Sequence, residues 1–246
     1  MKNIKAIIAY SGSHYFGFQK TKEGPSIEEA LEQALFRILR HQVTIQAASR
    51  TDRGVHAQGQ VVHFFASVED LAALKRSVQA VLPKDIALLS LEFATPDFHP
   101  TLDCHSKEYH YFICNDSFQL PFHRDTSWHY PYPLDIEKMQ KAAEFFIGTQ
   151  NFSAFANERL ENSEEAIRTL YTLTVQTLPE NRLQISVVGN AFLYKMVRTI
   201  VGTLVYVGQG KIPLEKLPLI IEAQDRTQAG VTAPAHGLFL HKVNYL

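Results

Sequence analysis

The order of periodic segments along the chain constrains its fold more than any other feature. Apolar residues that alternate with polar ones predict strands, and apolar residues at three- and four-residue spacing predict helices. The first half gives strands over residues 2–10, around 43–45, over 60–66 and over 86–93, with helices over 26–39 and 69–80. This order, β-α-β-β-α-β, is that of the split-βαβ or ferredoxin-like unit.

The second half repeats the same order of elements without any repeat of sequence. Strands are predicted over 107–114, 169–178, 182–188 and 238–245, and helices over 135–147, 192–207 and, as an addition, 214–223. Residues 115–133 are a predicted loop, and residues 151–166 are predicted to be irregular. We therefore predict an α+β protein of two ferredoxin-like domains, residues 1–103 and 104–246. Their antiparallel sheets would meet at a central cleft, a common place for an active site.

A short loop in the first half holds the first candidate for chemistry. Asp52 is flanked by Arg50 and Arg53, and Gly54 tolerates the geometry of a turn. Positive charge on both sides favours the ionised form of a carboxyl group. An ionised carboxylate at the end of a strand suits a nucleophile or a general base. A surface turn with a weak ion pair is the alternative for so short a pattern.

The longer stretch around this loop is more specific. Residues 49–64 read Ser-Arg-Thr-Asp-Arg-Gly-Val-His-Ala-Gln-Gly-Gln-Val-Val-His-Phe. This resembles the signature of the TruA-type tRNA pseudouridine synthases, in which the Asp of Arg-Thr-Asp is catalytic. The resemblance implies a pseudouridine synthase fold with Asp52 as the catalytic residue. The neighbouring Arg50, Arg53 and His56 are then candidate substrate-binding residues.

A strand pattern in the second half matches the same family. Lys107, Tyr109 and Tyr111 fit its Lys/Arg-x-Tyr-x-Tyr motif. The resemblance implies that Tyr109 packs against the target base, and it makes Lys107 a candidate substrate contact. From the residues alone, tyrosines on one strand face either stack bases on an open sheet or fill a covered core.

The start of the last long predicted helix matches as well. Residues 192–198 follow the family pattern Phe-Leu-x-x-Met-Val-Arg, and residues 232–238 follow Thr-Ala-Pro-Ala-x-Gly-Leu. The resemblance implies that Arg198 pairs with Asp52, a role that suits the guanidinium fork. Phe192 is a further candidate substrate contact. A solvent-exposed arginine is the alternative for Arg198.

Composition restricts the setting of the protein. The only two cysteines, Cys104 and Cys114, indicate a reducing compartment and hence the cytoplasm. No apolar run approaches the length of a membrane span. The eleven histidines show no metal-ligand spacing, and no glycine-rich phosphate loop occurs, so neither a metal nor a cofactor is expected. A net charge of −1 does not suggest RNA, although a local basic patch would be enough to bind phosphates.

These observations lead to one expected function and two rivals. By resemblance, the protein is a cytoplasmic isomerase that converts uridine to pseudouridine in the anticodon arm of tRNA, at tRNA positions 38, 39 and 40. The resemblance also implies a homodimer. One rival is a non-catalytic RNA-binding module. The other is a glycoside-type hydrolase, which normally needs two nearby carboxylates where this loop offers only Asp52.

Overall fold

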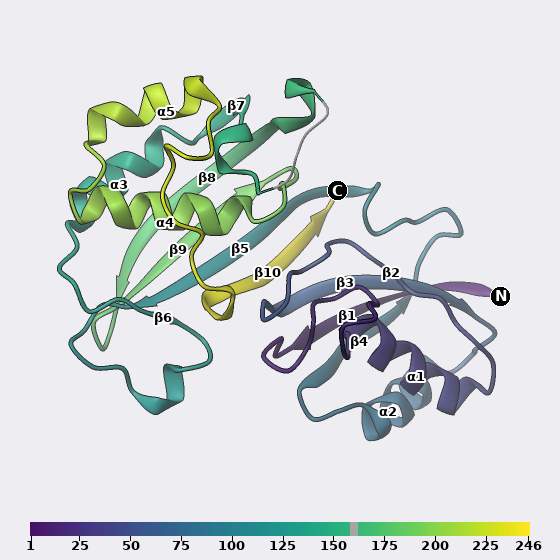
Figure 1. Ribbon diagram of the computed structural model, residues 1–246. Helices are drawn as coiled ribbons and strands as arrows, with labels where there is room; N and C mark the ends of the chain where they lie inside the picture. The colour runs from purple at the N-terminus through teal and green to yellow at the C-terminus, as the bar shows by residue number, and fades with distance from the viewer. Residues whose placement is uncertain (158–161) are drawn as a thin grey trace. The chain divides into compact units, whose positions relative to one another are not determined.

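The structure, a computed structural model, describes residues 1–157 and 162–246 (Figure 1). The chain forms two compact units: residues 1–105 with 239–246, and residues 106–238. The sequence analysis divided the chain at residue 103 and left the last strand in the second half. In the structure that strand, β10 (Leu238–Tyr245), runs parallel to β3 (His56–Ala66), which groups it with the first unit.

The first unit contains a sheet with the order β4-β1-β3-β10. Strand β2 pairs with part of β3 on the edge that faces away from β1. The remaining strands are β1 (Lys2–Tyr10), β2 (Gln46–Ala47) and β4 (Ile86–Phe93). The pairs β1–β3, β1–β4 and β2–β3 are antiparallel, as predicted, and the β10–β3 pair is parallel. β3 begins four residues earlier than its apolar pattern indicates, so it starts directly after the loop of Asp52.

Two helices cover one face of this sheet. Helix α1 (Ile27–Leu39) begins after Ser26, whose hydroxyl accepts a hydrogen bond from the Glu29 N–H, as its capping-box spacing predicts. Helix α2 (Leu71–Val81) is capped by Asp70 and begins two residues after the predicted start. Apolar side chains of both helices and of β1, β3 and β4 enclose a small core void, lined by Ala6, Ile8, Leu31, Leu35, Ile45, Val62, Phe64, Val78, Leu88 and Leu91.

The second unit contains a sheet with the order β5-β9-β8-β7, and β6 pairs with the end of β5. Its strands are β5 (Cys104–Cys114), β6 (Trp128–His129), β7 (Gly148–Asn151), β8 (Ile167–Leu178) and β9 (Arg182–Gly189). The predicted hairpin of β8 and β9 is confirmed, and its turn places Glu180 and Asn181 at positive φ. The two short strands β6 and β7 were not predicted.

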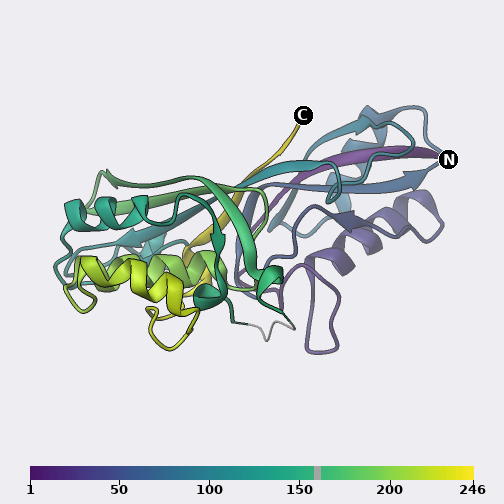
Figure 2. The ribbon, with the colours of Figure 1, turned by 90° about the horizontal axis from the view of Figure 1, so that it is seen from above.

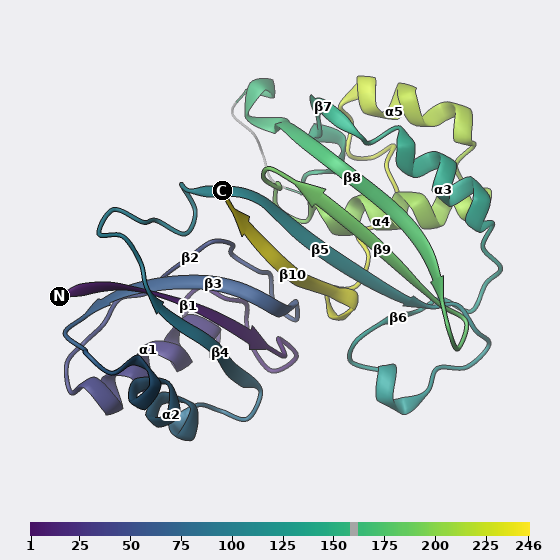
Figure 3. The ribbon, with the colours of Figure 1, turned by 180° about the vertical axis from the view of Figure 1, so that it is seen from behind.

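The helices of this unit lie on one face of its sheet, as Figures 1 and 3 show from opposite sides. Seen from above in Figure 2, the yellow-green α4 and α5 lie on the same side of the strands. The bounds are α3 (Ile136–Glu144), α4 (Met196–Gly208) and α5 (Leu217–Ala223). Helix α4 begins four residues later than predicted because Lys195 adopts a left-handed conformation with a φ of 59°. Phe192 therefore lies in a loop.

Short 3₁₀ helices complete the described chain: η1 (Pro121–His123), η2 (Ser153–Phe155), η3 (Ser163–Ala166), η4 (Leu214–Lys216) and η5 (Ala235–Gly237). Residues 158–161, inside the segment predicted to be irregular, lie outside the described residues. Among the helices that the structure describes, none is long and apolar enough to cross a membrane.

Candidate active site

Asp52 lies in the tight loop that leads into β3. Gly54 adopts a φ of 79°, and the Val55 N–H closes the turn by donating to the Asp52 carbonyl oxygen at 3.1 Å. The Asp52 side chain is half-buried, while Arg50 and Arg53 are exposed. The loop therefore presents a carboxylate that is only partly in contact with solvent.

Buried hydrogen bonds fix the residue before Asp52. The Tyr10 and Thr51 hydroxyls lie 2.8 Å apart in the core, and the Phe18 N–H donates to the Thr51 carbonyl oxygen at 3.0 Å. The fully buried Gln60 amide donates to the Ser49 carbonyl oxygen at 2.6 Å and accepts from the Ser49 N–H at 3.3 Å. Both the side chain and the main chain of the loop are thus held in one position.

A second loop, residues 12–18, packs against this one, backbone on backbone. A Cβ atom on Gly12 would lie 2.0 Å from the Val55 carbonyl oxygen, so only glycine fits there. Gly17 has a φ of 106°, and a Cβ atom on it would lie 3.0 Å from the Thr51 carbonyl oxygen. Contacts this close add to the rigidity of the Asp52 loop.

Aromatic rings orient the two candidate binding residues that follow Asp52. The Arg53 guanidinium lies 4.0 Å from the centre of the Phe16 ring, a cation–π contact. His56 is 2% exposed and stacks on Phe239 with 4.6 Å between ring centres. Its Nδ1 accepts a hydrogen bond from the Gly12 N–H at 3.2 Å. Arg53 is thus presented at the surface, whereas His56 packs beneath the loop.

The tyrosines of β5 are buried. Tyr109 is 6% exposed, and its ring meets that of Phe192 edge to face at 5.1 Å. Tyr111 is fully buried, and its hydroxyl donates to the Pro234 carbonyl oxygen at 2.8 Å. Burial raises the pKa of Tyr111 well above its usual value, against the opposing effect of the Arg198 charge. Tyr111 is therefore a core residue, and Lys107, two residues before Tyr109, is half-buried.

Arg198 lies in the first turn of α4 and is half-buried. Its Nε donates to the Ala233 carbonyl oxygen at 2.7 Å, and its own carbonyl oxygen accepts from the Ala233 N–H at 3.0 Å. These two hydrogen bonds fix the direction of the guanidinium. Arg198 is therefore not a solvent-exposed arginine, the alternative that its sequence left open.

The partner of Arg198 belongs to residues 230–234, here called the anchor segment, which lies flat on α4. A Cβ atom on Gly202 would lie 1.7 Å from the Val231 carbonyl oxygen. The Gly230 N–H donates to the Thr203 hydroxyl at 2.9 Å. This packing gives a physical reason for the Thr-Ala-Pro-Ala motif, because the motif supplies the main-chain groups that hold Arg198.

Sequence reasoning missed several residues that support the site. Tyr10 and Gln60 support the Asp52 loop from the core, and Ala233 anchors Arg198. Arg226 also contacts the anchor segment, through two hydrogen bonds, and donates a third to Asn157. Only the density of motif matches near these positions could have marked them, since no local pattern shows which partners a polar side chain meets in the folded chain.

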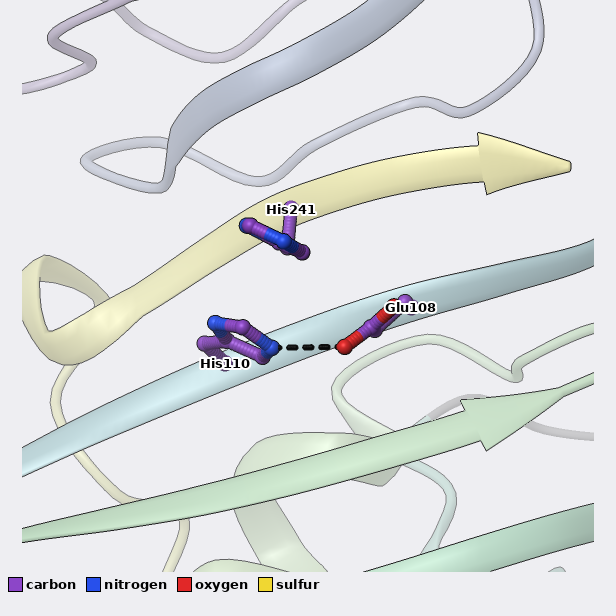
Figure 4. Close-up of side chains that lie close together, drawn as sticks. All are labelled: Glu108, His110 and His241. Carbon is purple, nitrogen blue, oxygen red and sulfur yellow. Dashed lines mark hydrogen bonds and ion pairs between the residues drawn. The ribbon is translucent and has the colours of Figure 1, made fainter.

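Glu108 and His110, which flank Tyr109 on β5, form a polar pair. The His110 Nε2 and the Glu108 Oε1 are 2.7 Å apart, the contact drawn as a dashed line in Figure 4. His241, drawn in the same figure, belongs to the other unit, where its Nδ1 lies 2.7 Å from the Gln58 Oε1. Glu108 and His110 thus bind each other through this hydrogen bond.

The structure brings the candidate residues into two groups. Arg50, Asp52, Arg53 and His56 share one loop of the first unit. The second unit holds Lys107, Tyr109, Phe192 and Arg198. Tyr109 contacts Phe192 and shares β5 with Lys107, and Arg198 is anchored at the start of α4.

Comparison with known proteins gives full-length matches. Residues 6–100 and 142–246 match the family model described as tRNA pseudouridine synthase. The chain is 51% identical over 248 residues to tRNA pseudouridine synthase A 2 of Protochlamydia amoebophila, covering 100% of this chain and 95% of that protein. It is 41% identical to tRNA pseudouridine synthase A of Thermoanaerobacter sp. and 40% identical to that of Pseudothermotoga lettingae, with 100% of each chain covered.

Proposed function

Because the chain belongs to the tRNA pseudouridine synthase family, we propose that Asp52 is the catalytic carboxylate of this isomerase, which acts on uridine in tRNA. In the reaction the bond between uracil N1 and ribose C1′ breaks, the base turns, and C5 bonds to C1′. The C5 hydrogen leaves to solvent and N1 gains a hydrogen, so no external reactant is consumed.

The scaffold beneath Asp52 is the observation that carries this assignment. Thr51 is held through its hydroxyl by Tyr10 and through its carbonyl by Phe18, and the Asp52 carbonyl closes a turn with Val55. A catalytic group gains most when its position is fixed before the substrate binds. A carboxylate held in this way can attack the sugar, attack the base or take a ribose proton.

In this proposal the second unit completes the site. The guanidinium of Arg198, directed by Ala233, pairs with the Asp52 carboxylate and keeps it oriented. The Tyr109 ring, supported by Phe192, faces the target base. Lys107 contacts the RNA near this base.

The proposed targets are uridines in the anticodon arm of tRNA. A stacked uridine must first be turned out of the helix, at a cost of a few kcal/mol. Arg53 is exposed and held over Phe16, so it is suited to fill the vacated space. Arg50 would contact phosphates, and His56 would support the loop from below. Family membership is our reason to expect a homodimer that works in the cytoplasm.

Tritium release from tRNA that carries C5-tritiated uridine tests the reaction. Release without free uracil is the expected result. Free uracil would instead identify a hydrolase, and no release would leave an RNA-binding module. Mapping pseudouridine in tRNA from a strain that lacks the protein then tests the site of action. The expected loss is confined to the anticodon arm, and an unchanged arm would contradict the proposed target.

A further inference from the structure

We propose that Arg226 is a positioning residue for the isomerisation and that it acts through the anchor segment on Arg198. The inference rests on the proposed role of Arg198 beside Asp52. Arg226 lies outside every motif that the sequence analysis singled out. Its role is inferred from its contacts alone.

The Arg226 guanidinium binds the anchor segment with both of its terminal nitrogens. Nη1 donates to the Gly230 carbonyl oxygen at 3.0 Å, and Nη2 donates to the Thr232 hydroxyl at 2.9 Å. Nε donates to the Asn157 Oδ1 at 2.8 Å, which ties the same fork to a second loop. Because the three donors share one rigid plane, the bond to Asn157 fixes the direction of the two bonds that position the segment.

The segment passes this constraint to Arg198 over one residue. Thr232, gripped by Arg226, directly precedes Ala233, which exchanges two hydrogen bonds with Arg198. The Val231 carbonyl oxygen packs against Gly202 of α4, where a Cβ atom would lie only 1.7 Å from it. The segment is therefore held both by α4 and by Arg226, and a shift at Thr232 also shifts the acceptor of the Arg198 Nε.

An arginine at position 226 suits precise placement of the anchor segment. All three acceptors of Arg226 are neutral, and burial lowers the pKa of its guanidinium. Burying the charged guanidinium costs solvation free energy, and a neutral side chain could fill the same space without that cost. A planar group with three fixed donors offers what an apolar residue lacks, which is orientation.

The test compares single-turnover rates of tritium release, with enzyme in excess, for Arg226→Lys, Arg198→Lys and the double variant. Lysine keeps the charge but loses the fork. We expect Arg226→Lys to slow the chemical step by about 10- to 100-fold, since small misplacements carry costs of this order. The dissociation constant for tRNA should stay within about twofold. Arg182→Lys, the same change at a half-buried arginine of the same unit, is the control and should leave the rate unchanged.

The double variant separates positioning from general support. If Arg226 acts through Arg198, adding Arg226→Lys to Arg198→Lys should slow the reaction no further. Equal multiplicative losses in both backgrounds, or a wild-type rate for Arg226→Lys, would overturn the inference alone. A wild-type rate for Arg198→Lys would instead reject the proposed role of Arg198, and the inference with it.

A milder variant covers the case in which Arg226→Lys fails to fold. Thr232→Val keeps the shape of the side chain and removes the acceptor of Nη2. It should slow the chemical step in the same direction by a smaller factor, again with tRNA binding retained. A loss of binding with the rate of bound tRNA unchanged would contradict the positioning role.

Discussion

The loop of Asp52 is held mainly by buried side chains, whereas Arg198 is held by main-chain groups. Thr51 depends on the Tyr10 hydroxyl, and Ser49 depends on the Gln60 amide. Arg198 instead exchanges two hydrogen bonds with the backbone of Ala233. In both regions a close backbone contact made possible by glycine lies next to these hydrogen bonds.

This difference determines which substitutions each region tolerates. A side-chain hydroxyl or amide is lost with a single substitution, and the buried hydrogen bond that it makes is lost with it. Main-chain groups persist under substitution, so the Arg198 anchor is sensitive only to changes that move the backbone. The first unit should therefore lose function through polar core substitutions, and the second through changes in the packing of the anchor segment.

The largest effect is expected for Asp52→Asn, which tests whether the first unit supplies the chemistry. Turnover should be abolished while folding and tRNA binding stay near those of the wild type, because the side chain keeps its size and the turn to Val55 uses the main chain. Tritium release and a tRNA binding titration measure the two quantities. Asp97→Asn, at an exposed position, is the control. Turnover within about tenfold of the wild type, with binding unchanged, would reject Asp52 as the catalytic residue.

The next largest effect is expected on the salt dependence of tRNA affinity when Arg37 and Arg76 are replaced with glutamine. Arg37 and Arg76 are exposed residues of α1 and α2 in the first unit, and we expect them to contact phosphates. Each lost phosphate contact should reduce the slope of log affinity against log salt by about 0.9. The control replaces Lys138 and Lys141 on α3 of the second unit with glutamine. An affinity that does not depend on salt would rule out this mode of binding.

A smaller effect is expected for Thr51→Val, which removes the hydroxyl that pairs with Tyr10 beneath the Asp52 loop. Loss of this buried hydrogen bond should lower the free energy of unfolding by about 0.5–1.5 kcal/mol. Loosening of the loop should slow turnover by about tenfold. Urea unfolding and tritium release measure these changes. Thr51→Ser keeps the hydroxyl and should recover most of the lost turnover; if it does not, the hydrogen bond is not what holds the loop.

The smallest effect concerns His63 in the first-unit sheet, which is 5% exposed and hydrogen-bonded to Asn3 and Gln46. Burial, and next the charge of His99, lowers its pKa from the ordinary 6.5. The folded state thus disfavours the protonated ring. The stability that the neutral ring contributes is present above about pH 6.5, the unfolded-state pKa, and is lost as the pH falls from there through the lower folded-state pKa. Urea unfolding at about pH 7.5 and pH 5.5 should show a larger loss for the wild type than for His63→Gln. Equal losses would mean that His63 does not contribute.

The sequence predicted elements where the controlling contacts are local. The start of α1 follows from Ser26 and Glu29, three residues apart. The start of α4 was predicted four residues too early, because the left-handed Lys195 interrupts an otherwise helical apolar pattern. The pairing of β10 with β3 joins residues far apart in the chain, so no local pattern could have indicated it.

The same limit applies to the candidate site. Asp52 and Arg198 stand in motifs that are legible in the sequence. Tyr10 and Arg226 do not, because their roles depend on contacts that only the folded chain provides. Sequence reasoning thus finds groups proposed to act on the substrate more readily than the groups that hold them.

The central claim is that the two units supply one site, and an experimental structure of the protein with bound tRNA tests it most directly. The decisive measurement is the separation between the Arg198 guanidinium and the Asp52 carboxylate. We expect roughly 2.7–3.0 Å, the range of a charge-assisted hydrogen bond, with the Tyr109 ring facing the turned-out base. Separations of both Arg198 and Tyr109 from Asp52 well beyond the reach of a bridging water would contradict the claim.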